Sequence, residues 1–91
     1  MRRAPARYHW GCNQPEALVE VTARDRPGLL HDLAGVFHAA RLSIHHANAT
    51  TRGAAVTDVF QVVRADGAKP GETELDAVTR AIEVRLAEKA P

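Results

Sequence analysis

The sequence predicts an α+β fold in which an antiparallel sheet carries two helices on one face. Three patterns lead to this expectation: an alternating apolar run at residues 16–23, two strand-like runs at 42–51 and 55–64 joined by a tight turn, and two amphipathic segments that follow the first and third runs. The 91 residues suffice for one domain with a small core. We expect a single domain over residues 7–91, behind a flexible tail at residues 1–6.

The first of these strands leads directly into a helix. Ala17, Val19 and Val21 share one face of the strand. Because proline has a helix-compatible φ and no N–H, the helix is expected to begin at Pro27, with Asp25 accepting hydrogen bonds from its first turn. The inward stripe of this helix is expected to consist of Leu30, Leu33, Phe37 and Ala40, with Leu29 and Val36 at its margins.

The next two strands are expected to form a β-hairpin around residues 52–53. Ile44 and Ala47 are separated by an odd number of residues and cannot share a face of an unbroken strand, so a bulge is expected near His45 and His46. The strand at 55–64 is apolar on both faces. We expect helices to cover one face, and another chain or domain to cover the second.

The second helix is expected to begin near Thr73 and to turn Leu75, Val78, Ile82 and Leu86 inward. The ferredoxin-like βαββαβ arrangement has a further strand after its second helix, and none is expected here. A short strand-like segment at residues 7–11 precedes the first main strand. This N-terminal segment is the candidate for the vacant edge of the sheet.

Composition and charge argue against several classes of function. Lys and Arg number 12 against 11 for Asp and Glu, and the hairpin offers only Phe60 for base stacking, so no nucleic-acid partner is expected. No apolar run is long enough to span a membrane, and the basic start is not followed by a signal-peptide core. With Cys12 as the single cysteine, these features favour a cytoplasmic chain without a membrane partner.

The five histidines do not form a metal-ligand pattern. His31 and His38 share a helix face, whereas the adjacent His45 and His46 point to opposite faces of a strand unless the bulge turns them. No nucleophile or acid-base constellation is visible either. We therefore expect no metal, no cofactor and no enzymatic activity.

The turn between the first main strand and its helix is the candidate binding site. Gly28 has no Cβ, so its backbone allows close approach by a ligand or a second chain. The N–H groups of Gly28 and Leu29 lie at the positive end of the helix dipole and suit a carboxylate. Asp25 would attract an ammonium group, so the turn suits both charged groups of an amino acid.

Several segments together resemble the ACT domain, a small regulatory module that binds amino acids at interfaces between subunits. They are residues 18–30, which include Asp-Arg-Pro-Gly-Leu-Leu at 25–30, then 42–44, 47–51, and 56–60 with Asp-Val-Phe at 58–60. The chain is most similar to the ACT modules at the C-terminus of the bacterial bifunctional uridylyltransferase and uridylyl-removing enzyme, which senses glutamine. Those modules also have an extra N-terminal strand and end with the second helix. The resemblance implies a ferredoxin-like fold.

The resemblance also implies where an effector binds. In the family, the strand-to-helix turn of one subunit faces the strand after the first helix of another. Carried to this sequence, one wall of the site consists of Asp25, Arg26, Pro27, Gly28, Leu29 and Leu30, and the other includes Ser43. The expected function is a non-catalytic sensor of an amino acid, with glutamine as the first candidate, that forms a homodimer through sheet or helix-edge contacts. The alternative is a ligand-free module for dimerisation or protein docking.

Overall fold

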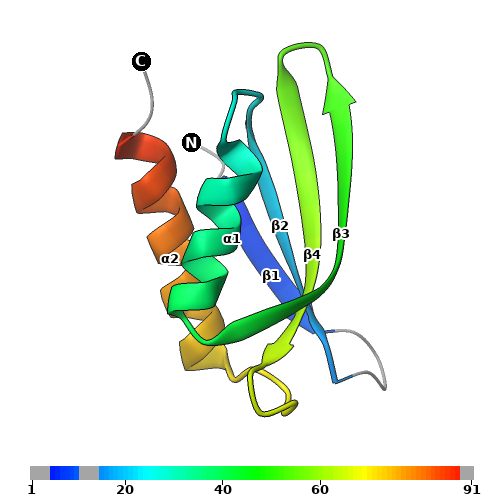
Figure 1. Cartoon of the computed structure of the whole chain (residues 1–91), viewed down its shortest axis with the longest axis vertical. Helices are drawn as coiled ribbons and strands as arrows, with labels where there is room; N and C mark the ends of the chain where they lie inside the picture. Colours follow the sequence, from blue (N-terminus) through cyan, green and yellow to red (C-terminus); the bar gives the residue numbers. More distant parts are fainter. Residues whose placement is uncertain (1–4, 11–14, 89–91) are drawn as a thin grey trace.

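The computed structural model describes residues 5–10 and 15–88, and within them the chain forms four strands and two helices (Figure 1). In chain order these elements are β1 (Ala6–Trp10), β2 (Ala17–Arg24), α1 (Leu29–Ala39), β3 (Leu42–Arg52), β4 (Ala55–Arg64) and α2 (Glu72–Glu88). The strands form one antiparallel sheet in the order β1-β2-β4-β3, and both helices lie on the same face of it. The α+β, ferredoxin-like fold predicted from the sequence is confirmed.

β1 takes the sheet edge that a final strand fills in other ferredoxin-like folds. It pairs antiparallel with β2, and Tyr8 stands opposite Val19. The Tyr8 hydroxyl donates to the carboxylate of Asp76 on α2 at 2.5 Å, and the indole N–H of Trp10 donates to the carbonyl of Pro70 at 3.0 Å. The N-terminal strand therefore occupies the vacant edge, as the sequence predicts.

The N-terminal segment expected as a tail, residues 1–6, lies partly within the sheet and partly outside the described residues. β1 begins at Ala6, which is 5% exposed, so the sheet takes in the last residue of the segment expected as a tail. The backbone carbonyl of Pro5 also accepts a hydrogen bond from the N–H of Thr22 at 2.8 Å. The rest of the expected tail, residues 1–4, and Cys12 lie outside the described residues.

The core lies between the sheet and the two helices. Ala17, Val19 and Val21 of β2 are fully buried and alternate with residues that face the other way, as their spacing predicts. Phe37 of α1 and Phe60 of β4 meet with their ring centroids 4.9 Å apart. Burial of such a side chain contributes about 1.5–3 kcal/mol to stability and holds α1 on this face, while the buried Leu75, Val78 and Ile82 hold α2 there.

The sheet face away from the helices is mixed in character. On β4, Thr57, Val59 and Gln61 alternate with core residues and are half-buried, and Leu18 and Glu20 of β2 lie beside them. The two-sided pattern of β4 therefore produces an outer face with apolar and polar side chains together. Its coverage by another chain or domain stays a prediction.

The start of α1 differs from the sequence prediction. The helix begins at Leu29, two residues after Pro27. Its N-cap is Gly28, and no side chain in the described part of the protein caps it, so Asp25 is not the N-cap. Gly28 has φ of +81° and ψ of 0°, which are the angles of the third residue in a type II turn. The N–H of Leu29 closes that turn on the carbonyl of Arg26 at 3.2 Å. Pro27 therefore occupies the second position of a type II turn, which proline favours as strongly as a first helical turn.

The later start also changes which face of α1 is buried. Leu30 is 57% exposed, contrary to the inward position predicted for it, while Leu29 is 4% exposed. The buried stripe is Leu29, Leu33, Val36 and Phe37. These spacings of four and three residues belong to a helix that begins at Leu29.

The β3–β4 hairpin follows the sequence prediction closely. The register between the two strands shifts between Ile44 and His46, which is the predicted bulge. Beyond this shift Ala47 pairs with Phe60, so Ile44 and Ala47 both face the helix side. The strands are joined through Gly53, whose φ of +60° suits a tight hairpin turn.

In α2, the buried residues are Leu75, Val78, Thr79 and Ile82, so three of the four predicted inward positions are fully buried. Leu86, the fourth, is partly buried and packs against the core. Neither α1 nor α2 has the length and apolar character needed to cross a bilayer, as judged over the described residues.

Candidate functional site

The turn between β2 and α1 presents backbone N–H groups to its surroundings. The first hydrogen bond inside the helix runs from the N–H of Asp32 to the carbonyl of Gly28 at 2.9 Å. The N–H groups of Gly28, Leu30 and His31 donate to no other residue in the described part of the chain. Because they lie at the positive end of the α1 dipole, they can hold an anionic group. Leu29, by contrast, uses its N–H within the turn.

Some side chains of the turn are exposed to solvent, and one packs back along α1. Asp25 and Pro27 are exposed, and the Asp25 N–H donates to the carbonyl of Ala54 in the hairpin turn at 2.9 Å. Arg26 folds back along α1, where its guanidinium donates to the Asp32 carboxylate at 2.8 Å. This partly buried ion pair holds the turn against the helix, so Arg26 acts on the shape of the site.

Ser43 lies far from the turn within one chain. It opposes Val63 near the start of β3, whereas Arg52 at the other end of β3 lies beside the turn through Ala55. At about 3.3 Å per residue, this separation along the strand is about 30 Å. The structure therefore brings the residues of the turn together and leaves Ser43 at the opposite end of the sheet.

Asp58 of β4 is a charged residue on the core side of the sheet that the sequence-based site did not include. It is 5% exposed and stands between Val21 of β2 and Ala49 of β3. Burial raises the pKa of its carboxyl group above the usual value, and the negative charge of Asp25 raises it further. Asp58 alternates with the core residues Val56 and Phe60, which was the available sequence signal.

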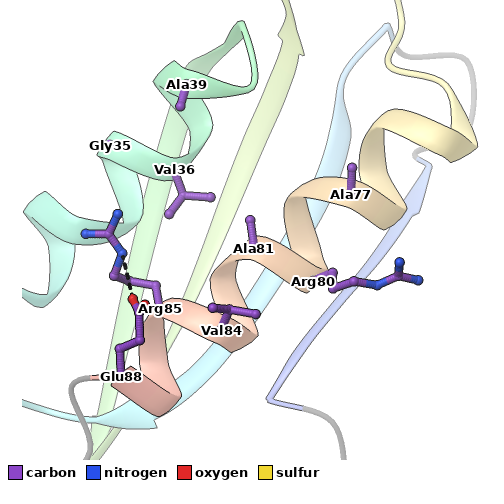
Figure 2. Close-up of a pocket in the computed structure, with 9 residues that line it drawn as sticks. All are labelled: Gly35, Val36, Ala39, Ala77, Arg80, Ala81, Val84, Arg85 and Glu88. Atoms are coloured by element: carbon purple, nitrogen blue, oxygen red, sulfur yellow. Dashed lines mark ion pairs between the residues drawn. The ribbon is translucent and has the colours of Figure 1, made fainter.

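A groove between the two helices is a second surface feature (Figure 2). It has a volume of about 570 Å³, and small or apolar side chains form most of its lining: Gly35, Val36 and Ala39 on α1, and Ala77, Ala81 and Val84 on α2. Val84 is 55% exposed. An ion pair between Arg85 and Glu88, 3.8 Å apart, lies at the C-terminal end of α2 beside the groove.

Metal-ligating side chains do not gather among the described residues. No group of three or more His, Cys, Asp or Glu side chains in residues 5–10 and 15–88 is placed to hold a metal ion. His45 instead contacts the Glu16 carboxylate through Nδ1 at 3.2 Å.

The fold and the turn agree with a known family. The model of the ACT domain matches residues 17–83, which include β2, α1, the β3–β4 hairpin and most of α2. The chain belongs to the ACT-domain family. ACT domains are regulatory modules that bind small molecules and carry no catalysis themselves, and the turn at residues 25–28 lies inside the matched region.

Curated relatives of this ACT domain carry the name bifunctional uridylyltransferase/uridylyl-removing enzyme. The protein of Novosphingobium aromaticivorans is 41% identical over 73 residues, which are 80% of this chain and 8% of the relative. That of Gluconobacter oxydans is 49% identical over 45 residues, or 50% of this chain and 5% of the relative. That of Streptomyces coelicolor is 36% identical over 69 residues, or 76% of this chain and 8% of the relative. The chain therefore spans less than a tenth of these relatives' length.

Proposed function

We propose that this ACT domain is a non-catalytic, cytoplasmic regulatory module that binds a free amino acid at the turn between β2 and α1 and self-associates. The observation that carries the proposal is the set of N–H groups without a partner at Gly28, Leu30 and His31. They converge at the positive end of α1 and suit an α-carboxylate. Glutamine is the first candidate, because the resemblance to the uridylyltransferase modules implies it.

The turn is suited to this role because its shape is held in advance. The Arg26–Asp32 ion pair and the hydrogen bond from Asp25 to Ala54 fix both sides of the turn. Gly28 keeps the left-handed conformation that leaves its N–H free. A preorganised set of donors costs little ordering entropy when the carboxylate binds.

Self-association is proposed through the free edge of β3. If two copies of β3 pair antiparallel around Ala47 and Asn48, Ser43 of the partner subunit comes opposite Arg52 and therefore close to the turn. This pairing would join the two walls that are about 30 Å apart within one chain. It would also satisfy the unpaired backbone groups of an edge strand.

Calorimetric titration of the purified chain with each of the twenty amino acids tests ligand binding. We expect saturable heat with at least one of them, glutamine first, and a rise in the thermal midpoint with the same ligand. If no amino acid gives either response, the ligand-binding half of the proposal is wrong. Light scattering at micromolar concentration tests the other half, since a monomer would contradict self-association.

The alternative, a ligand-free docking module, draws on the groove between α1 and α2. Its apolar lining and the exposed Val84 suit an apolar partner surface. Val84→Glu separates the two interfaces. If this substitution converts a dimer to a monomer, the helix groove is the interface, whereas an unchanged mass favours the β3 edge.

A further inference from the structure

Asp58 is the most anomalous polar group in the described part of the chain. Its neighbours on the core side of the sheet are apolar, with Val56 and Phe60 along β4 and Val21 and Ala49 across the strands. It is 5% exposed, yet no hydrogen bond or ion pair joins its carboxylate to another described residue. Carboxylates at such positions are almost always paired, because an unpaired buried charge is costly.

The nearby cationic side chains do not supply the missing partner. Arg26 is committed to Asp32 at 2.8 Å. Arg24 is exposed and pairs in register with Ala55, and these two positions face the opposite side of the sheet from Asp58. Within residues 5–10 and 15–88, the charged group that acts on Asp58 is Asp25, and its like charge adds to the cost of ionisation. The two carboxylates together therefore favour the arrival of a positive charge.

The carboxylate of Asp58 is also reachable from outside. Asp58 is 5% exposed, and among the described residues no side-chain polar atom is both fully enclosed and without a hydrogen-bond partner, so part of its carboxylate contacts solvent. On the β3 side of it, Ala47 and Ala49 face the helix side of the sheet but are exposed. These small, exposed alanine side chains leave the approach to Asp58 open on the β3 side.

We propose that Asp58 receives the ammonium group of the amino acid whose carboxylate is held by the turn. This inference rests on the proposed function and deepens it by assigning the second charged group of the ligand. Asp25 then adds negative potential at the mouth of the site and makes no direct contact with the ammonium. The ion pair between Asp58 and the ammonium group explains why an acid occupies a position that otherwise favours an apolar residue. Proteins place buried, unpaired charges of this kind at functional sites.

The site so defined recognises a zwitterion. N–H groups at the start of α1 take the negative end, and a buried carboxylate takes the positive end. Both ends are charge-assisted contacts, so neither a simple carboxylic acid nor a simple amine satisfies the site. The ligand class is therefore a free α-amino acid with an unblocked amino group.

A double-mutant-type cycle tests the proposal by comparing the affinities of two proteins for two ligands. The amino acid that binds the unmodified chain is titrated beside its N-acetyl derivative, into the unmodified chain and into Asp58→Asn. In the unmodified chain we expect acetylation to weaken binding about 10- to 100-fold, the usual worth of a charge-assisted contact. In Asp58→Asn the free amino acid should bind as weakly as the derivative, so the penalty for acetylation disappears.

The controls make each result decisive. Glu83→Gln removes a carboxylate on α2 for which the described residues offer no ion pair, and it should bind like the unmodified chain. If Asp58→Asn keeps the full penalty for acetylation, or if Asp25→Asn abolishes the penalty and Asp58→Asn does not, the proposal is overturned. Asp58→Ala, checked by circular dichroism, repeats the test if the asparagine variant does not fold. An unmodified chain that binds no amino acid would overturn the proposed function itself, and this inference with it.

Discussion

The β1 edge of the sheet and the region around the β2–α1 turn differ in how completely their polar groups are paired. At the β1 edge, Tyr8 donates to Asp76 and Trp10 donates to Pro70. Within the adjacent α2, the Thr79 hydroxyl donates to the carbonyl of Leu75 at 2.9 Å. The β3 side consists of the β2–α1 turn, Asp58 of β4, and Ala47 and Ala49 of β3. Among the described residues, the turn has N–H groups without partners, and the carboxylate of Asp58 has no hydrogen bond or ion pair. The polar contacts of the β1 edge therefore stabilise the fold, whereas the polar groups of the β3 side remain available to a ligand.

This difference indicates that one region of the domain serves stability and the other serves ligand binding. The β1 edge restores a strand position of the ferredoxin-like fold and fastens it to α2. The β3 side keeps small exposed residues, a left-handed glycine and an unpaired carboxylate, each of which weakens a domain that must be held together by a small core. Substitutions at the β1 edge and α2 should change stability alone, and those at the turn and Asp58 should change ligand binding as well.

The largest expected effect contrasts two leucines. Leu75→Ala removes a fully buried side chain of α2 and should lower the free energy of unfolding by about 2–5 kcal/mol, measured by urea denaturation. Leu30→Ala removes a side chain that is 57% exposed and should change stability by no more than about 0.5 kcal/mol. Equal losses at both positions would remove the contrast between the two sides.

The next effect concerns the backbone of the turn. Gly28→Ala places a Cβ on a residue with φ of +81°, which should cost about 1–2 kcal/mol although no heavy atom lies within 4 Å of the new Cβ. Gly35→Ala is the matched control, because its Cβ also meets open space but its position is inside α1. The control should stabilise the chain by about 0.5–1 kcal/mol. A Gly28→Ala chain as stable as the control would mean that the left-handed turn is not required.

A smaller effect of opposite sign is expected at Asp58. Its pKa in the folded chain is raised from 3.8, so its protonation stabilises the fold, fully below pH 3.8 and less as the pH rises through the folded-state value. Asp58→Asn stays neutral and should raise the thermal midpoint at pH 7, with the gain shrinking as the pH falls. Thermal melts of both chains from pH 3 to pH 8 measure this. A lower midpoint for the variant at pH 7 would indicate that the carboxylate stabilises the ligand-free fold.

The smallest effect concerns titration of the β1 edge. The hydrogen bond to Asp76, followed by burial and nearby negative charge, raises the pKa of Tyr8 from 10.0 to about 12. Tyr8 is the only tyrosine, so ultraviolet absorbance reports its ionisation directly. In Asp76→Asn the pKa should move back toward 10.0. An identical titration in both chains would show that this contact does not persist in solution.

The sequence predicts the sheet well because its signals are local. β2 and β3 lie within one residue of their predicted bounds and β4 matches them, and the bulge followed from an odd spacing between Ile44 and Ala47. The start of α1 was missed because Pro27-Gly28 suits a type II turn as well as a helix start, and the choice depends on tertiary context. The apolar pattern of β4 does not reveal Asp58, because a single acid among Val56, Phe60 and Val62 leaves the apolar character of that face unchanged.

An amide NMR titration with the bound amino acid shows whether the β2–α1 turn holds the ligand. We expect the amide signals of Gly28, Leu30 and His31 to shift with ligand concentration, while those of Tyr8 and Trp10 at the β1 edge do not. Shifts confined to Gly35 and Val84 would place the ligand in the helix groove instead. That result, or the absence of any shift at the turn, would show that the turn does not hold the amino acid.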